Sequence, residues 1–288
     1  MTAFHADLGL ARRFSATLDQ ILVDHVGVVA KLRPESGAMA LPVADGFALY
    51  CGQGTDPAAN RVTGLGMHGP VTAEHFDAME AFYAERNMPC VIALYPFADA
   101  SATYQAAARG YMLHMFRNVL ARPVDAASIG APDRDPLADA AAAGIVVERA
   151  RADEAELWAR VVGSGFAEKE LDAPAFGRLV AFHCPDTVCY FGRIDGEEAG
   201  GGAMTIKDGF AYIWEVATRP SFRRRGVQQA IYHTLVQEAA RAGCDAVALG
   251  TEVGHVSQRN AERAGFRLIF TGAALVRQLP GASSVRVK

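Results

Sequence analysis

Three consecutive arginines precede a glycine in the segment Arg223-Arg224-Arg225-Gly226, and a helical pattern begins at Val227. The first turn of a helix presents unpaired backbone N–H groups and the positive end of the helix dipole. A glycine there lets an anion approach the backbone, and arginines add forked donors suited to phosphate. The spacing therefore predicts a pyrophosphate-binding loop. The alternative is an exposed basic turn before an ordinary helix.

The elements around this loop follow from hydrophobic spacing. Three strands form a meander, because Asp195-Gly196 and Asp208-Gly209 are pairs typical of tight hairpins. The loop leads from the last of these strands into an amphipathic helix. The elements expected in this half are a strand at 145–148, a helix at 152–162, strands at 188–194, 200–205 and 210–217, a helix at 227–242, a strand at 246–249, a helix at 257–264 and a strand at 266–276.

The first half shows related patterns, separated from the second by an alanine- and proline-rich stretch. The elements expected there are helices at 8–32 and 72–87 and strands at 46–51, 61–65 and 90–94. Placing residue n against residue n+155 gives seven identities over positions 84–113, including Gly110 with Gly265. Both windows also predict the same order of helix, strand, helix and strand. We interpret them as two copies of one α/β unit.

The loop resembles the central motif of the GNAT N-acetyltransferase superfamily, Arg/Gln-x-x-Gly-x-Gly/Ala, and reads Arg223-x-x-Gly226-x-Gln228 here. The Val216–Thr218 strand end and the Gly265-Phe266 pair also match the family pattern. The resemblance covers about Ile145 to Leu279 and, more faintly, the first half. It implies an α/β (mixed α+β) fold of two tandem GNAT-like domains, each a mixed, mostly antiparallel sheet flanked by helices. The expected organisation is a degenerate domain at 1–121, a linker at 122–144 and an acetyl-coenzyme A-binding domain at 145–288.

The resemblance implies acetyl-coenzyme A (acetyl-CoA) as co-substrate and no metal. The first half has no arginine cluster at the matching position and is not expected to bind coenzyme A by itself. Two departures stand out: Gln228 replaces the second small residue of the loop, and Ala261 stands where the family often has a tyrosine that protonates the thiolate. The residues implied for coenzyme A binding are Val216, Ala217, Thr218, Arg223, Arg224, Arg225, Gly226, Val227, Gln228, Gln229, Asn260 and Arg263.

Family chemistry is the direct attack of an amine on the thioester, which requires a base and a polarising donor. The donor maps to about Val216, so the base is expected on the same strand. Glu215 and Tyr212 are the two candidates, and strict alternation would place them on opposite faces. A structural carboxylate is the alternative role for Glu215. His255 is a further candidate, as an acid that protonates sulfur, with an ordinary loop histidine as its alternative.

The composition of the chain argues against several other functions and locations. The net charge of −4 argues against a nucleic-acid partner and against an aminoacyl-tRNA donor. Five irregularly spaced cysteines favour neither a disulfide framework nor a zinc site. Without a long apolar run, the chain is expected in the cytoplasm and not at a membrane. The prediction is an N-acetyltransferase acting on a primary amine of a small molecule or peptide, as a monomer or homodimer. A non-catalytic acyl-CoA-binding or sensing protein is the alternative.

Overall fold

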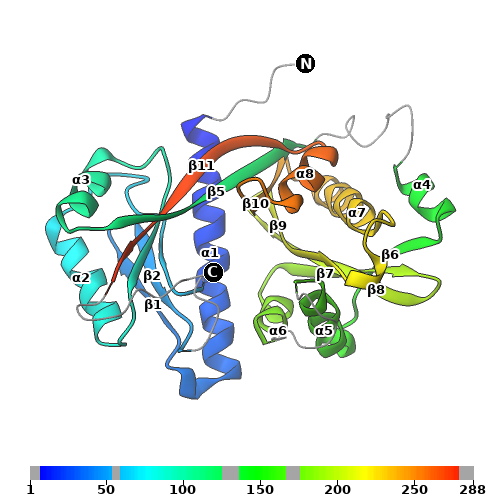
Figure 1. The fold of residues 1–288 in the computed structure, drawn as a ribbon, viewed down its shortest axis with the longest axis horizontal. Helices are drawn as coiled ribbons and strands as arrows, with labels where there is room; N and C mark the ends of the chain where they lie inside the picture. The colour runs from blue at the N-terminus through cyan, green and yellow to red at the C-terminus, as the bar shows by residue number, and fades with distance from the viewer. Residues whose placement is uncertain (1–6, 54–58, 125–135, 167–175, 279–288) are drawn as a thin grey trace. The chain divides into compact units, whose positions relative to one another are not determined.

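The computed structural model describes residues 7–53, 59–124, 136–166 and 176–278. None of the helices in these ranges combines the length and the apolar composition that a bilayer span requires. The helices are α1 (Leu8–Leu32), α2 (Ala73–Ala84), α3 (Ala100–Ala108), α4 (Pro136–Ala142), α5 (Ala155–Phe166), α6 (Phe176–His183), α7 (Val227–Arg241) and α8 (Val256–Arg263). The strands are β1 (Met39–Val43), β2 (Gly46–Tyr50), β3 (Val62–Thr63), β4 (Cys90–Leu94), β5 (Met112–Pro123), β6 (Ile145–Arg149), β7 (Thr187–Ile194), β8 (Glu197–Lys207), β9 (Phe210–Thr218), β10 (Ala246–Glu252) and β11 (Arg267–Arg277) (Figure 1).

The expected elements are present, with small shifts at their ends, and the mixed α/β class is confirmed. Two elements were not predicted from sequence, β1 and α6. The predicted linker 122–144 overlaps two regular elements, since β5 extends through Pro123 and α4 occupies Pro136–Ala142. The middle of that linker, 125–135, lies outside the described residues.

The chain divides into two compact units, and one of them combines two separate stretches of the sequence. Among the described residues, the C-terminal unit takes 119–269, and the N-terminal unit takes those up to 118 and those from 270 onward. Strands β5 and β11 therefore each contribute residues to both units. The division into domains at 1–121 and 145–288, with a linker between them, stays a prediction.

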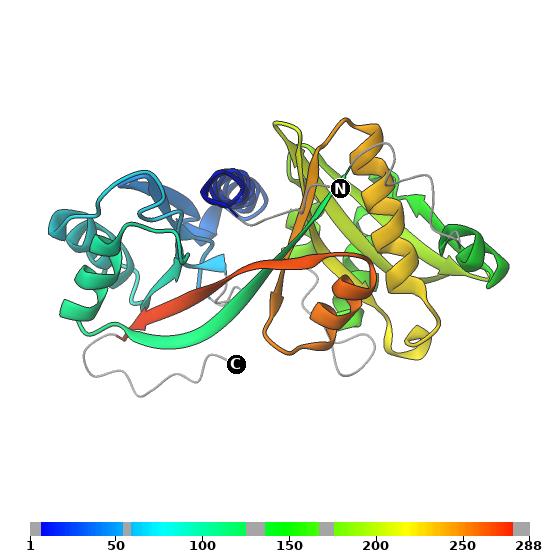
Figure 2. The same cartoon turned by 90° about the horizontal axis from the view of Figure 1, so that it is seen from above.

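In the C-terminal unit, the strand order is β5-β10-β9-β8-β7-β6. Strands β6 to β9 form an antiparallel meander, while β10 runs parallel to β9. Both predicted hairpin turns are confirmed, because Asp195, Gly196, Asp208 and Gly209 all have positive φ. Helix α7 covers one face of this sheet, and α5 and α6 cover the other (Figures 1 and 2).

The N-terminal unit has the strand order β1-β2-β3-β4-β11. Its main core lies between this sheet and helices α2 and α3. The centre of that core is filled by large side chains, among them Phe76, Met79 and Tyr83. Helix α1 contributes Phe14, whose ring meets Tyr95 and Phe270 edge to face. Each unit thus has a core of its own.

The internal repeat is confirmed element by element. An offset of 155 places α2 on α7, β4 on β10, α3 on α8 and β5 on β11. The turn after α3 and the turn after α8 contain the same backbone hydrogen bond, from Tyr111 N to Ala106 O (3.0 Å) and from Phe266 N to Ala261 O (3.1 Å). The glycine before each aromatic residue has positive φ, 76° and 86°. The two copies therefore share local geometry as well as residue identities.

The final strands of the two copies are exchanged. Strand β11 ends the second copy but pairs antiparallel with β4 of the first, from Ala273 opposite Leu94 to Arg277 opposite Cys90. Strand β5 ends the first copy and neighbours β10 of the second. Arg277 at the end of β11 forms an ion pair with Glu80 of α2. Hydrophobic spacing could not predict this exchange, because a strand has the same period whichever neighbour it pairs with.

In the first copy, a carboxylate from the turn between β1 and β2 binds the loop that corresponds to the arginine loop of the second copy. Asp45 accepts hydrogen bonds from the backbone N–H groups of Gly66 (2.7 Å) and His68 (2.5 Å). Nearby, Asp19 accepts from Thr63 and Ser15, and burial raises the pKa of Asp19 to about 6. Two amides of this loop thus have an internal acceptor, and the absence of coenzyme A binding by the first copy stays a prediction.

Asp45→Ala is expected to destabilise the protein by about 1–3 kcal/mol, because it leaves the buried N–H of Gly66 without its acceptor. Chemical denaturation monitored by circular dichroism measures this change. Asp45→Asn is the matched control: it keeps the shape and one acceptor oxygen, so its loss should be smaller. Equal stability of Asp45→Ala and wild type would show that this carboxylate does not support the loop.

Candidate functional site

Strands β9 and β10 pair over only part of their length. The parallel register joins Ala246–Ala248 to Phe210–Tyr212 and then ends, although β9 continues to Thr218 and β10 to Glu252. The two strands therefore diverge toward their carboxyl ends. Backbone groups of β9 beyond Tyr212 have no ladder partner in β10, so they are placed to contact a ligand there.

A β-bulge interrupts β9 where the strands diverge. In the pairing with β8, Gly201 lies opposite Ala217 and Ala203 opposite Trp214, so two residues of β9 face Gly202 alone. Glu215, in the bulge, has a left-handed backbone with φ of 53°. Such a conformation at a residue other than glycine costs on the order of 1–3 kcal/mol and is enriched at functional sites.

The bulge corrects the expected facing of the two candidate bases. Tyr212 pairs directly with Thr205, and the indole N–H of Trp214 donates to Thr205 Oγ1 at 3.1 Å, which puts both aromatic side chains on one face. Glu215 also lies on that face, where it bonds to Arg178 of α6. Strict alternation, which would separate Glu215 from Tyr212, is wrong here because the extra residue reverses the side-chain phase. Val216 instead packs toward α7.

Glu215 and Arg178 form an ion pair on this reactive face. Arg178 Nε donates to Glu215 Oε2 at 2.9 Å, and the two side chains are about one-fifth exposed (19% and 21%). The guanidinium also lies over the ring of Phe166, 4.8 Å from its centroid. The pair favours the anionic form of Glu215, so the carboxylate is unprotonated but a weaker base than it would be without Arg178, and the same contact suits the structural role considered as the alternative. Sequence reasoning missed Arg178, because α6 was not predicted.

Three consecutive glycines on β8, Gly200 to Gly202, allow the bulge to form. A Cβ on Gly200 would lie 2.4 Å from the backbone oxygen of Ala217, and one on Gly202 would lie 2.8 Å from Ile231 of α7. Both approaches are closer than ordinary van der Waals contact, so these positions require glycine. A glycine run inside a strand was the available sequence signal for the bulge.

The arginine loop lies at the end of β9, as predicted. The chain passes through a short 3-10 turn at Pro220–Phe222 and enters α7 at Val227, with Gly226 as the N-cap at φ of 93°. No side chain caps this helix end. The first N–H groups of α7 have no partner within the helix, so an exposed anion site is available there.

The three arginines have different surroundings. Arg223 donates to the backbone oxygens of Gly165 (3.0 Å) and Thr218 (3.4 Å), which fastens the loop to the end of α5. Arg225 lies over the ring of Phe222 and 3.9 Å from a carboxylate oxygen of Asp195. Arg224 is exposed and has left-handed φ of 64°. Arg224 and Arg225 are therefore better placed than Arg223 to supply charge to a phosphate.

Helix α8 contacts the start of α7 through the residues predicted from sequence. Asn260 donates from its side chain to Gln228, and its backbone oxygen accepts from Gln229 at 2.7 Å. Arg263 reaches Asn260 at 3.5 Å. Gln228 also bonds to Tyr232, whose pKa burial raises to about 12. The departure from a small residue at Gln228 thus has a structural role: its side chain ties α8 to α7.

The residues at the end of β9 fit a diphosphate group. Thr218 Oγ1 is buried and has no hydrogen-bond partner among the described residues. A Cβ on Gly226 would meet only Ile145, at 3.5 Å, so the space over this glycine is open. Together with the uncapped helix start and the exposed Arg224, these features provide donors and room for a bound anion.

Other candidates take ordinary structural roles. His255 Nδ1 caps α8 by accepting from Ser257 N, as expected of a loop histidine. Ala261 is fully buried and offers no proton donor. Among the described residues, no group of three or more His, Cys, Asp or Glu side chains could hold a metal ion.

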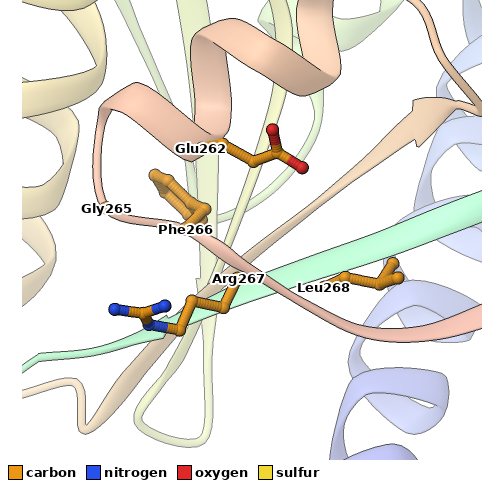
Figure 3. A pocket seen from close by; sticks show the side chains of 5 residues that line it. All are labelled: Glu262, Gly265, Phe266, Arg267 and Leu268. Carbon is orange, nitrogen blue, oxygen red and sulfur yellow. The ribbon is translucent and has the colours of Figure 1, made fainter.

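A pocket of about 360 Å³ lies at the turn from α8 into β11. It is lined by Glu262, Gly265, Phe266, Arg267 and Leu268. Figure 3 shows the carboxylate of Glu262 and the guanidinium of Arg267 pointing away from each other. Because its charged groups do not converge, this pocket is a weaker ligand site than the end of β9.

Comparison with known proteins identifies a matching family model and similar structures, independently of the geometry of the site. Residues 153–266 match the acetyltransferase (GNAT) family model. A GCN5-related N-acetyltransferase from Kribbella flavida has a similar structure, with a TM-score of 0.61 and 20% identity over 90% of this chain and 96% of that one. A tandem GNAT protein from the clavulanic acid biosynthesis pathway gives 0.53 and 14%, over 73% and 70%. These similarities establish the fold. No curated protein sequence gave a match.

Proposed function

We propose that this protein, whose residues 153–266 match the acetyltransferase (GNAT) family model, transfers the acetyl group of acetyl-CoA to a primary amine of a small molecule or peptide. The observation that carries the proposal is the uncapped, arginine-rich start of α7 directly after the diverging end of β9. The start of α7 offers hydrogen-bond donors to phosphate, and the preceding end of β9 offers backbone amides that do not pair with β10. A thioester with a diphosphate tail requires both.

In the proposed reaction, the amine nitrogen bonds to the thioester carbonyl carbon and the carbon–sulfur bond breaks. Coenzyme A leaves as a thiolate and gains a proton, while the amine nitrogen loses one. Glu215 is the proposed acceptor of the amine proton, with Tyr212 as the competing residue on the same face. Backbone N–H near Val216 is the proposed donor to the carbonyl oxygen.

One observation favours a second function, an acyl-CoA-binding protein without transfer activity. Ala261 occupies the position where related enzymes often carry a tyrosine, and it is fully buried. The Arg178 partner of Glu215 also gives that carboxylate a structural role. Both features are compatible with ligand binding without turnover.

Titration of the full chain with acetyl-CoA by calorimetry is expected to show one binding site. A panel of primary amines is then assayed for turnover. With at least one amine, the rate of coenzyme A release should exceed the rate measured without an amine. Binding without turnover on any amine would favour the second function. Absence of binding would contradict both.

A further inference from the structure

The reactive face of β9 presents two opposite charges next to each other. Glu215 projects from the bulge, and Arg178 near the start of α6 reaches it with an Nε to Oε2 distance of 2.9 Å. Each side chain keeps about one-fifth of its surface exposed (19% and 21%), so the pair is only partly removed from solvent. An acceptor that approaches the bulge therefore meets a carboxylate and a guanidinium together.

The guanidinium has a fixed orientation. Its carbon lies 4.8 Å from the centroid of Phe166, at the end of α5, while its Nε points to Glu215. A planar guanidinium held between a ring and a carboxylate keeps its donors in one plane. That geometry suits a second, planar anion such as a carboxylate.

Polar side chains beside the pair on this face contact one another. The N–H of Trp214 is occupied by Thr205, whose hydroxyl also contacts that of Thr187. Below them lies an apolar cluster that includes Phe191 and Trp158. The Glu215–Arg178 pair supplies both a negative and a positive charge at this face.

The pair discriminates between classes of amine. A simple alkylammonium ion is attracted by Glu215 but repelled by Arg178 a few ångströms away, so it gains little. A compound that carries an acid group beside its amine presents the complementary pair of charges. We propose that the acceptor is an amino acid-like zwitterion, whose ammonium group meets Glu215 and whose carboxylate is bound by Arg178.

This proposal rests on the proposed function and adds the substrate class. Its test uses the full chain, saturated with acetyl-CoA, and pairs of acceptors that differ only in the acid: α-amino acids and the corresponding carboxamides. In at least one pair, the acid is expected to show a kcat/KM about tenfold or more above that of its amide, chiefly through KM. Calorimetric titration of the same pairs into protein saturated with coenzyme A should show the same preference.

Arg178→Gln should bring the acid-to-amide ratio close to one and leave acetyl-CoA affinity unchanged. Arg178→Lys should restore part of the preference, because it returns the charge without the planar fork. Arg160→Gln is the matched control, since Arg160 lies exposed on α5, where it forms an i,i+4 ion pair with Glu156. If Arg178 only supports the fold, its loss should reduce both acceptors equally and leave the ratio intact.

The outcomes separate this proposal from the proposed function. Turnover of amides as efficient as that of their acids, or a preference that survives in Arg178→Gln, overturns the acid-recognition proposal while transfer stands. Arg178-dependent binding of the acids without turnover supports recognition and contradicts transfer. If neither acids nor amides bind to the coenzyme A-saturated protein, zwitterion recognition is wrong.

Discussion

Glu215→Gln is expected to lower turnover by about 10²–10⁴-fold and to leave the affinity for acetyl-CoA unchanged, if Glu215 accepts the amine proton. The bulge fixes its position: Glu215 has φ of 53° where β9 diverges from β10, and its side chain lies on the face that Tyr212 shares. Glutamine preserves the shape and an oxygen that can accept from Arg178, but it cannot accept a proton at neutral pH.

Steady-state kinetics with saturating acetyl-CoA measures this effect. Tyr212→Phe is the comparison on the same face, and it should remain close to wild type. A large loss in Tyr212→Phe with normal turnover in Glu215→Gln would reassign the base. Unchanged rates in both would mean that the proton leaves through water and that the protein contributes mainly orientation.

The structural role of Glu215 makes a different prediction for the same variant. If the Arg178 ion pair only fastens α6 to β9, Glu215→Gln should lower the melting temperature without a selective effect on turnover. Both side chains are only about one-fifth exposed, so removing the charge of Glu215 leaves the Arg178 guanidinium without its compensating anion and lowers stability. Thermal denaturation of the variant therefore separates the two roles.

The sequence predicted the parts of the fold that depend on local spacing. The offset of 155 residues, found from seven identities, correctly matches α2 with α7 and β4 with β10. Helix α7 starts at Val227, directly after the arginines and Gly226, as the sequence predicted. These features depend on hydrophobic periodicity, turn residues and the residues at a helix N-terminus. All of these are set by residues that are close in the sequence. The Asp-Gly hairpins were predictable for the same reason.

The remaining features depend on contacts between distant segments. The exchange of β11 onto β4 leaves no mark in the hydrophobic pattern, since any partner strand would satisfy it. The bulge at Glu215 depends on the glycines of β8, and its effect was to bring Glu215 and Tyr212 to one face. Arg178 became visible only once α6 was placed against β9.

Replacing Arg224 and Arg225 together with alanine is expected to weaken acetyl-CoA binding by about 10²–10⁴-fold, and each single replacement by about 10–100-fold. Each lost charge-assisted contact to phosphate should cost on the order of 1.5–3 kcal/mol. Both side chains are exposed at the uncapped start of α7, whereas Arg223 donates to backbone oxygens of Gly165 and Thr218. Arg223→Ala should therefore lower stability as well as affinity.

Calorimetry at two ionic strengths tests this assignment of the pyrophosphate site. Salt should weaken binding to the wild type more than to the double variant, because screening acts on the charges that the variant has lost. Arg241→Ala is the matched control: Arg241 ends the same helix and pairs with Glu238 there. A double variant with wild-type affinity would place the diphosphate elsewhere. Equal losses in the double variant and Arg241→Ala would indicate a general charge effect, since the dipole at the start of α7 acts only within its first turn.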